Sequence, residues 1–182
     1  MISEELSVLK IISQRLEEAR IPYMLTGSIA MNYYATPRMT RDLDLVIELK
    51  ASDIQNLIRE FQKDFYIDSD AITEAITHQS MFNIIHNEWV IKVDFILRKQ
   101  SPYHQLEFER RKKVKIKDFE FWIVSAEDLI LSKLNWAKES MSDFQLRDVQ
   151  NLLQGIEKID LDYIKKWVIN LKLEVLYQKV RQ

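Results

Sequence analysis

The chain has 182 residues, of which 47% are hydrophobic and 30% are charged, and its formal net charge at pH 7 is −2. This length can bury one sizeable core, and the near-neutral charge does not indicate a general nucleic-acid or membrane coat. The absence of cysteine excludes disulfides, thiol nucleophiles and iron–sulfur centres. No apolar stretch approaches the roughly 18 residues that span a bilayer. The acidic N-terminal sequence is unlike a secretory signal, so we expect a cytoplasmic protein.

The first part of the sequence alternates between helix and strand patterns. Residues 3–20 place apolar side chains at a helical period, and Pro22 ends that helix. We expect a short strand at 23–26 and a short helix at 29–35. Residues 42–49 then predict a largely buried strand.

The middle of the sequence predicts two further helices and several strands that pair as hairpins. The helices are 54–61 and 70–77, and the strands are 65–67, 81–85, 89–97, 114–116 and 119–124. No element is predicted in the polar, basic region at 98–113. Its end, Arg110-Arg111-Lys112-Lys113, would suit an RNA backbone. A solvated sheet edge, where lysines discourage edge-to-edge pairing, is the favoured explanation.

From Ser125 onward the pattern is helical. Ser125-Ala126-Glu127-Asp128 resembles a capping box with Asp at its fourth place. Helices are predicted over 126–138, 143–154 and 160–179, the last with a break. The fold class is therefore α+β or α/β, with a core over 1–124 and a helical C-terminal region over 125–182 packed on it.

Three aspartates stand out because of where they lie in the predicted strands. Asp42 and Asp44 are two apart on one strand and so project to the same face. Two neighbouring carboxylates repel each other, and a hard cation such as Mg²⁺ removes that repulsion. Asp94 interrupts another apolar strand and needs a partner, either a metal or a salt bridge to Lys92 or Arg98. If this strand lies beside the Asp42 strand, the three acids converge and can hold two cations for phosphoryl transfer.

Gly27-Ser28 follows the first predicted strand and precedes a helix. Glycine lets the backbone approach a phosphate closely, and the N–H groups and dipole of a helix N-terminus favour an anion. A Gly-Ser pair alone is more often a structural turn. Together with the acids, it favours a phosphate site.

The combination of Gly27-Ser28, a short helix and Arg38-x-Thr40-x-Asp42-Leu43-Asp44-Leu45 resembles the signature of the polymerase-β-type nucleotidyltransferase superfamily. Within that superfamily it is most similar to the small bacterial branch of AbiEii-like and minimal nucleotidyltransferases. The resemblance covers about residues 23–94 and extends more weakly to Leu152. It implies a mixed central sheet flanked by helices and a helical C-terminal region.

The resemblance also implies roles for individual residues. Gly27 and Ser28 would hold the triphosphate, and Asp42 and Asp44 would ligate Mg²⁺ or Mn²⁺. Asp94 would be the third ligand and would help to deprotonate the acceptor.

Further nucleotide-contacting residues follow from the same resemblance or from position. Lys133 would contact phosphates, and Arg147-Asp148 matches a later basic–acidic pair of the AbiEii-like branch. Arg38 and Arg41 flank the metal strand and would meet phosphate or simply balance charge. A lysine on an amphipathic helix is more often a solvated side chain, and the four tryptophans, at 89, 122, 136 and 167, are expected in the core.

We therefore expect a metal-dependent nucleotidyltransferase that moves NMP from an NTP such as ATP to an acceptor hydroxyl. The acceptor would be an RNA 3′ end, a protein or a small molecule such as an antibiotic, and the resemblance suggests a toxin–antitoxin or phage-defence module. The alternatives are a non-catalytic module that binds a nucleotide or a partner, and a phosphohydrolase. The sequence lacks a His-Asp ligand cluster that would favour the phosphohydrolase.

Overall fold

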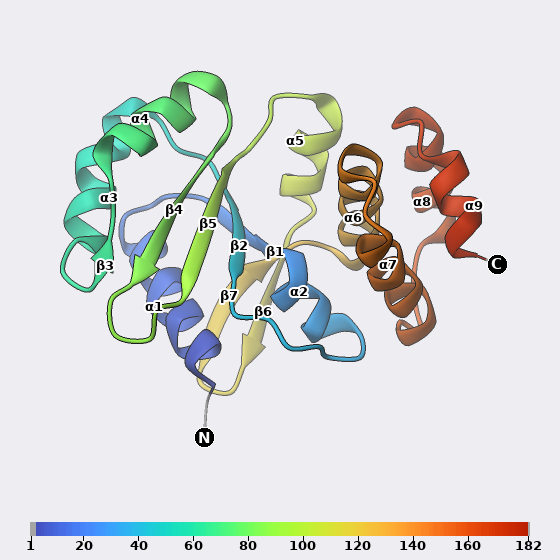
Figure 1. Ribbon diagram of the computed structural model, residues 1–182, viewed down its shortest axis with the longest axis horizontal. Helices are drawn as coiled ribbons and strands as arrows, with labels where there is room; N and C mark the ends of the chain where they lie inside the picture. Colours follow the sequence, from blue (N-terminus) through green and yellow to red (C-terminus); the bar gives the residue numbers. More distant parts are fainter. Residues whose placement is uncertain (1–2, 182) are drawn as a thin grey trace.

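The computed structural model describes residues 3–181 and is built on a seven-stranded sheet in the order β3-β4-β5-β2-β1-β7-β6 (Figure 1). The strand β1 (Tyr23–Thr26) is antiparallel to the central β2 (Leu43–Ile47) and parallel to β7 (Phe119–Ile123). β2 is in turn parallel to β5 (Lys92–Leu97). The expected mixed sheet is confirmed.

The outer strands form the two predicted hairpins. β4 (Met81–His86) pairs with β5 and is extended by the short β3 (Phe65–Tyr66), while β6 (Lys112–Ile116) pairs with β7. β6 is an edge strand, so the lysines of this strand lie where edge protection was expected. Arg110, just before β6, turns to the C-terminal helices and lies 3.0 Å from a carboxylate oxygen of Asp128.

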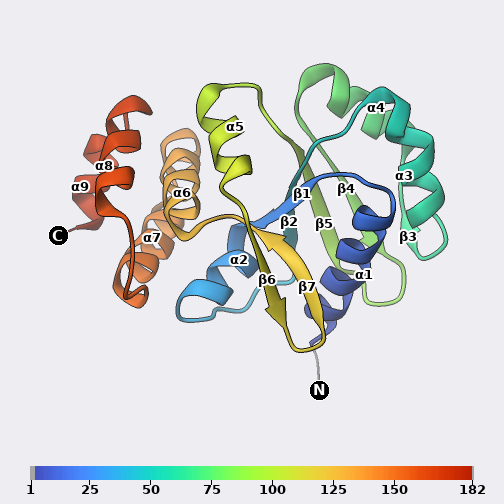
Figure 2. The same cartoon turned by 180° about the vertical axis from the view of Figure 1, so that it is seen from behind.

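One face of the sheet is covered by α1 (Glu4–Glu18) and α3 (Ile54–Phe61), which follows the short 3-10 turn Ala51–Asp53. Leu43, Leu45 and Ile47 of β2 are buried, and Phe61 of α3 meets Phe95 of β5 edge-on, with ring centroids 6.2 Å apart. α4 (Ser69–His78) lies beside α3 (Figures 1 and 2). This apolar layer is the main core.

The opposite face of the sheet carries the alternating residues of β2 and β5, among them Asp44 and Asp94. It is bordered by α2 (Gly27–Tyr34), α5 (Pro102–Glu109) and α6 (Ala126–Ser140). The remaining helices lie beyond α6 (Figures 1 and 2). They are α7 (Asp143–Gly155), α8 (Leu161–Asn170) and α9 (Glu174–Val180), so the break expected within 160–179 is confirmed.

The structure corrects several boundaries, three of them at segments near the acidic residues, and adds one helix. α2 begins at Gly27 rather than 29, β2 begins at Leu43 and so leaves out Asp42, and β5 begins at Lys92 rather than 89. α5 lies in the region where no element was predicted. Ser101 caps this helix through the backbone N–H of His104 and Pro102 occupies its first turn.

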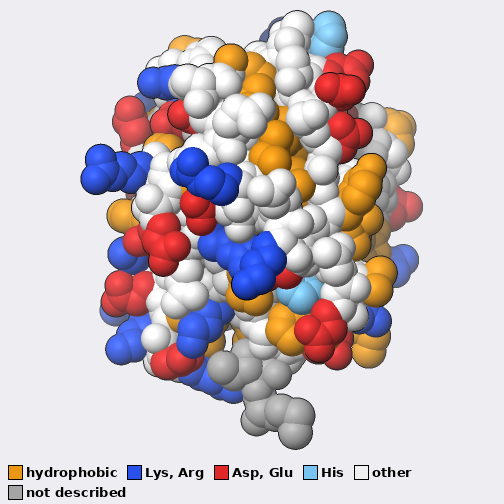
Figure 3. Space-filling view, turned by 90° about the vertical axis from the view of Figure 1, so that its left-hand side faces the viewer, with side chains coloured by type: hydrophobic (Ala, Val, Ile, Leu, Met, Phe, Trp, Pro, Cys, Tyr) orange, Lys and Arg blue, Asp and Glu red, His pale blue; other side chains and the backbone are white. Residues whose placement is uncertain are grey.

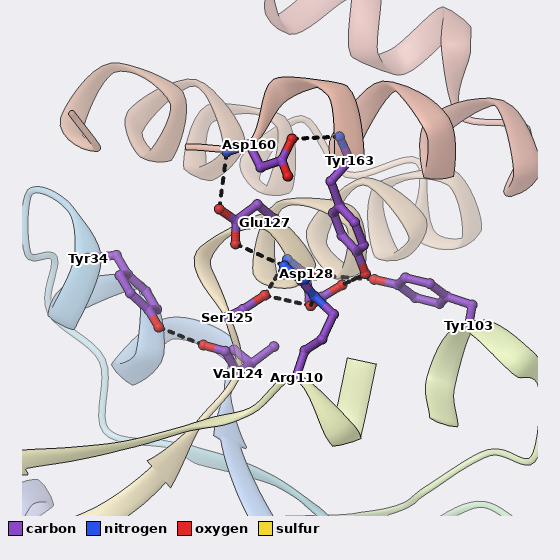
Figure 4. A network of polar contacts seen from close by, with 9 residues as sticks. All are labelled: Tyr34, Tyr103, Arg110, Val124, Ser125, Glu127, Asp128, Asp160 and Tyr163. Carbon is purple, nitrogen blue, oxygen red and sulfur yellow. Dashed lines mark hydrogen bonds and ion pairs between the residues drawn. The ribbon is translucent and has the colours of Figure 1, made fainter. Parts of the chain in front are cut away.

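A buried polar network joins α5, α6 and α8 (Figure 4). The predicted cap is confirmed, since the Ser125 hydroxyl accepts a hydrogen bond from the N–H of Asp128 at 3.1 Å. The fully buried Asp128 carboxylate accepts from Ser125 at 2.5 Å, from Arg110 at 3.0 Å and from the Tyr163 hydroxyl at 2.7 Å. This network fixes the C-terminal helices on the part of the chain that carries the sheet.

No helix within residues 3–181 is long and apolar enough to cross a membrane. On the face shown in Figure 3, Lys and Arg side chains are interspersed with Asp and Glu. That face has no single-sign patch of the kind that binds a nucleic-acid backbone.

Candidate active site

Asp44 and Asp94 lie directly opposite each other in the parallel pairing of β2 and β5. Paired residues of neighbouring strands project to the same face of a sheet, so the two carboxylates are neighbours. Burial, followed by the negative charge of Asp94, raises the pKa of Asp44 above its ordinary value. The predicted meeting of these two strands is confirmed.

Asp94 combines a cationic partner with an unsatisfied oxygen. It is 6% exposed, and its Oδ2 lies 2.8 Å from Nζ of Lys92, which is the salt bridge expected as the structural alternative. Its Oδ1 is buried without a hydrogen-bond partner among residues 3–181. An unpaired buried carboxylate oxygen is costly, so this atom is available to a ligand.

Asp42 is less closely associated with the other two acids than its sequence position predicts. The strand begins one residue later, and Asp42 is exposed in the preceding loop. Its charge still contributes to raising the pKa of Asp44. In the part of the chain that is described, no three His, Asp or Glu side chains are grouped closely enough to hold a metal ion.

Gly27 forms the turn from β1 into α2 directly against Asp44. Its φ is +66°, in the left-handed region that favours glycine, and an added Cβ would lie 2.0 Å from Oδ2 of Asp44. Thr26, the residue before the helix, makes no side-chain capping bond. The start of α2 lines the same cavity as Asp44, and the uncapped N–H groups of a helix start suit an anion.

Gly27→Ala is expected to destabilise the protein by about 1–3 kcal/mol and to weaken binding of an NTP with Mg²⁺ by at least about tenfold, because the methyl group forces the helix start away from Asp44. Urea unfolding and calorimetric titration measure the two effects. Gly155→Ala, at the only other glycine, is the control and should leave NTP affinity unchanged. Equal NTP affinity in wild type and Gly27→Ala would refute this role.

Two cations from distant segments meet one buried acid next to Ser28. Lys133, 3% exposed, places Nζ 2.6 Å from Oδ2 of Asp148, and Arg38 donates to both oxygens of Asp148 at 3.1 Å. Arg38 also donates to the Ser28 hydroxyl at 2.5 Å. Burial lowers the pKa of Lys133, while the bond to Asp148 opposes that shift.

Two adjoining cavities lie between the sheet and α6. The smaller, about 180 Å³, is lined by Gly27, Ser28, Asp44, Lys133 and Gln145 among others. The larger, about 350 Å³, extends along β5 towards α5. The two share lining residues, which are Thr26, Ile96, Ser132 and Trp136. Gly27, Ser28 and Lys133 thus lie at one end of a longer depression.

Neither a protein-family model nor a curated protein sequence matches the chain. Solved structures do match. An antigenic nucleotidyltransferase-like protein from Paracoccidioides brasiliensis is 18% identical, with a TM-score of 0.60 over 84% of this chain and 77% of that one. Lincomycin-bound LnuA, a lincosamide antibiotic adenylyltransferase, is 16% identical, with a TM-score of 0.53 over 84% and 96%. The antibiotic-resistance factor ANT(2″)-Ia is 13% identical, with a TM-score of 0.56 over 98% and 91%.

The chain has the nucleotidyltransferase fold. In this fold, the sequence-predicted residues Gly27, Ser28, Asp44 and Lys133 line one cavity, and Asp94 lies beside Asp44. Other expected residues lie elsewhere.

Arg41 is one of them. It contacts Glu4 at 3.2 Å and the carbonyl of Trp89 at 3.2 Å, outside that cavity, because the loop before β2 turns it towards α1. Arg147 is exposed, whereas its neighbour Asp148 is buried.

Several residues that line or support the candidate site were not expected from the sequence. Gln145 accepts a hydrogen bond from Lys133 at 3.2 Å, and Phe144 stacks under Arg38 with 4.3 Å between guanidinium carbon and ring centroid. Trp136 was expected in the core but is 47% exposed at the junction of the cavities. A polar residue three positions before Asp148, one helical turn away, was the only signal for Gln145.

Glu107 of α5 lines the larger cavity and is 5% exposed. Burial raises its pKa from 4.5 to about 8, with the charge of Asp128 adding to the effect. A raised carboxyl pKa stabilises the fold fully below the unfolded-state value, and that stabilisation is lost as the pH rises through the folded-state value.

The wild type should therefore lose stability between about pH 4.5 and 8, by up to about 5 kcal/mol at 1.36 kcal/mol per pKa unit. Glu107→Gln removes the ionisation and should show a flatter profile in urea unfolding over this interval. The exposed Glu109→Gln on the same helix is the control and should follow wild type. Parallel profiles for wild type and Glu107→Gln would contradict the assignment.

Proposed function

We propose that the protein is a metal-dependent nucleotidyltransferase that transfers an NMP from an NTP to an acceptor hydroxyl and releases pyrophosphate. The observation that carries this proposal is the side-by-side pair of Asp44 and Asp94 at the glycine-started N-terminus of α2. The buried Lys133 lines the same cavity and supplies positive charge. Acidic metal ligands next to an anion-binding helix start form the arrangement that this reaction requires.

The acidic pair fits a divalent cation through its charge and its free oxygen. Asp44 and Asp94 repel each other, and Oδ1 of Asp94 is buried without a partner in the described chain. These two residues would hold Mg²⁺ or Mn²⁺, with Asp42 as a third carboxylate from the exposed loop before the strand. When bound, the ion supplies positive charge that neutralises the triphosphate and lowers the pKa of the acceptor hydroxyl.

The side chains of the protein account for the other requirements of the reaction. The α2 N–H groups and Ser28 hold the triphosphate, and Lys133 and Arg38 offset its charge. Asp94 accepts the proton of the acceptor hydroxyl, whose oxygen attacks the α-phosphorus. The bond from that phosphorus to the bridging oxygen then breaks, and pyrophosphate leaves. Catalysis rests on positioning and electrostatics.

A small-molecule acceptor is the class that the comparisons favour. LnuA and ANT(2″)-Ia are an antibiotic adenylyltransferase and an antibiotic-resistance factor, and both share the fold. An RNA 3′ end or a protein hydroxyl remains the alternative. The motif resemblance to the AbiEii-like branch supports a place in a toxin–antitoxin or phage-defence module.

Lys133→Met is expected to weaken NTP binding by about 10–100-fold, because a buried charge-assisted bond to phosphate is lost. The exposed Lys138→Met lies on the same helix and removes the same charge, so it serves as the matched control. Calorimetric titration with ATP and Mg²⁺ measures both. Tight binding without any pyrophosphate release from any NTP would instead support the non-catalytic module.

A further inference from the structure

The larger cavity has the position of an acceptor site. It contains Ile96, which lies two residues beyond Asp94 on the same strand face, and it opens from the phosphate-binding cavity at Thr26 and Ser132. Asp94 itself lines neither cavity, so a molecule in the larger one would reach it along β5, past Ile96. Its volume of about 350 Å³ suits a drug-sized molecule or a single nucleoside rather than a polymer.

The walls of this cavity are mostly apolar, with one buried acid. Val46, Met81, Leu97 and Trp136 are among the residues that line it. Glu107 lines the same cavity and is only 5% exposed. It makes no hydrogen bond or ion pair with any residue in 3–181. A buried carboxyl without a hydrogen-bond partner indicates that a group of a bound ligand supplies the missing hydrogen bond.

The other charged residues of the cavity are largely engaged. Arg98 bonds to Glu48 at 2.5 Å, Glu139 accepts from Asn135 at 3.2 Å, and the His104 ring lies 2.6 Å from the Ser101 hydroxyl. Lys99 interacts with Glu107 only at longer range, through its positive charge. The cavity therefore has neither the excess of cations that an RNA end requires nor the group of acids that a polycation requires.

We infer that this cavity binds the acceptor, and that the acceptor is a compact, largely apolar alcohol carrying one amine that pairs with Glu107. This inference rests on the proposed function, because the reacting hydroxyl must lie at Asp94. The amine would form a hydrogen-bonded ion pair with the buried Glu107 carboxyl, while Trp136 and the aliphatic wall enclose the apolar part of the acceptor.

The test uses two-dimensional amide NMR of the ¹⁵N-labelled full chain with defined probes. 2-Amino-1-phenylethanol carries one amine, and 1-phenylethane-1,2-diol is its neutral counterpart. Tobramycin is the polycation, and a short RNA oligonucleotide is the polyanion. Each is titrated with and without saturating α,β-methylene-ATP and Mg²⁺, whose binding is recorded separately at Gly27 and Ser28.

The amine should bind about tenfold more tightly than the diol, shift the amides around Met81 and Leu97, and bind equally well with the ATP analogue present. Glu107→Gln should abolish the preference for the amine, whereas Glu109→Gln on the same helix should retain it. Met81→Trp, which fills the cavity from its 44% exposed rim, should weaken both probes and leave ATP-analogue binding unchanged.

Equal affinities for amine and diol, or tighter binding of tobramycin or RNA there, would overturn the inference. Mutual exclusion of the amine and the ATP analogue would also overturn it, because the cavity would then hold the nucleoside. Selective amine binding by a chain that does not bind the analogue would refute nucleotidyl transfer and the acceptor role, and would leave an amine-binding site.

Discussion

Asp94→Asn is expected to lower the rate of NMP transfer by at least about a hundredfold while leaving the fold intact. Asparagine has the shape of aspartate but cannot hold a divalent cation against the triphosphate or take the acceptor proton. Lys92, which loses its partner, has a side chain 41% exposed and can turn to water. Asp44→Asn should have a comparable effect, since it removes the paired ligand.

Pyrophosphate release with saturating NTP and Mg²⁺ measures the rate, and circular dichroism checks the fold. The exposed Asp70→Asn in α4 is the control and should keep wild-type activity. Asp42→Asn should have a smaller effect than the other two, because Asp42 is exposed and outside the strand. Retention of activity within about twofold in either Asp44→Asn or Asp94→Asn would contradict the assigned mechanism.

Asp128→Ala is expected to lower the free energy of unfolding by about 3–5 kcal/mol. Asp128 is fully buried and accepts hydrogen bonds from Ser125, Arg110 and Tyr163 (Figure 4), so its removal leaves several buried donors without a partner. The network joins α5, α6 and α8, and the loss should therefore loosen α8 in particular.

Urea unfolding gives the change in stability, and amide exchange in α8 reports the loosening. Asp162→Ala is the matched control, since its side chain is 96% exposed, and it should change stability by less than about 0.5 kcal/mol. A loss below about 1 kcal/mol for Asp128→Ala would show that these contacts contribute little.

The sequence predicted the acidic pair because the relevant information is local. Asp44 and Asp94 each interrupt an apolar strand, and strand alternation fixes the face to which each points. The turn at Gly27 follows for the same reason, since glycine before a short helix is a local signal. Asp44 and Asp94 then lie together if β2 and β5 are neighbours, and the family resemblance implied that they are.

The contact of two cationic side chains with Asp148 depends instead on how α7 packs against the rest of the chain. No local sequence pattern predicts that packing. Arg38 and Lys133 converge on Asp148 from segments distant in the sequence. Arg41 was expected near the nucleotide from its place in the motif, but the path of one loop turns it to Glu4. α5 was missed because its polar composition lacks a clear apolar stripe, although Ser101 and Pro102 mark its start.

The most direct test of the central claim compares which phosphate of the NTP reaches the acceptor. The protein is incubated with Mg²⁺ and ATP labelled at either the α- or the γ-phosphate, together with separated small-molecule, RNA and protein fractions. Nucleotidyl transfer predicts α-label on an acceptor and γ-label in pyrophosphate, with both lost in Asp44→Asn. Label from the γ-phosphate on an acceptor, or its release as inorganic phosphate alone, would contradict the account.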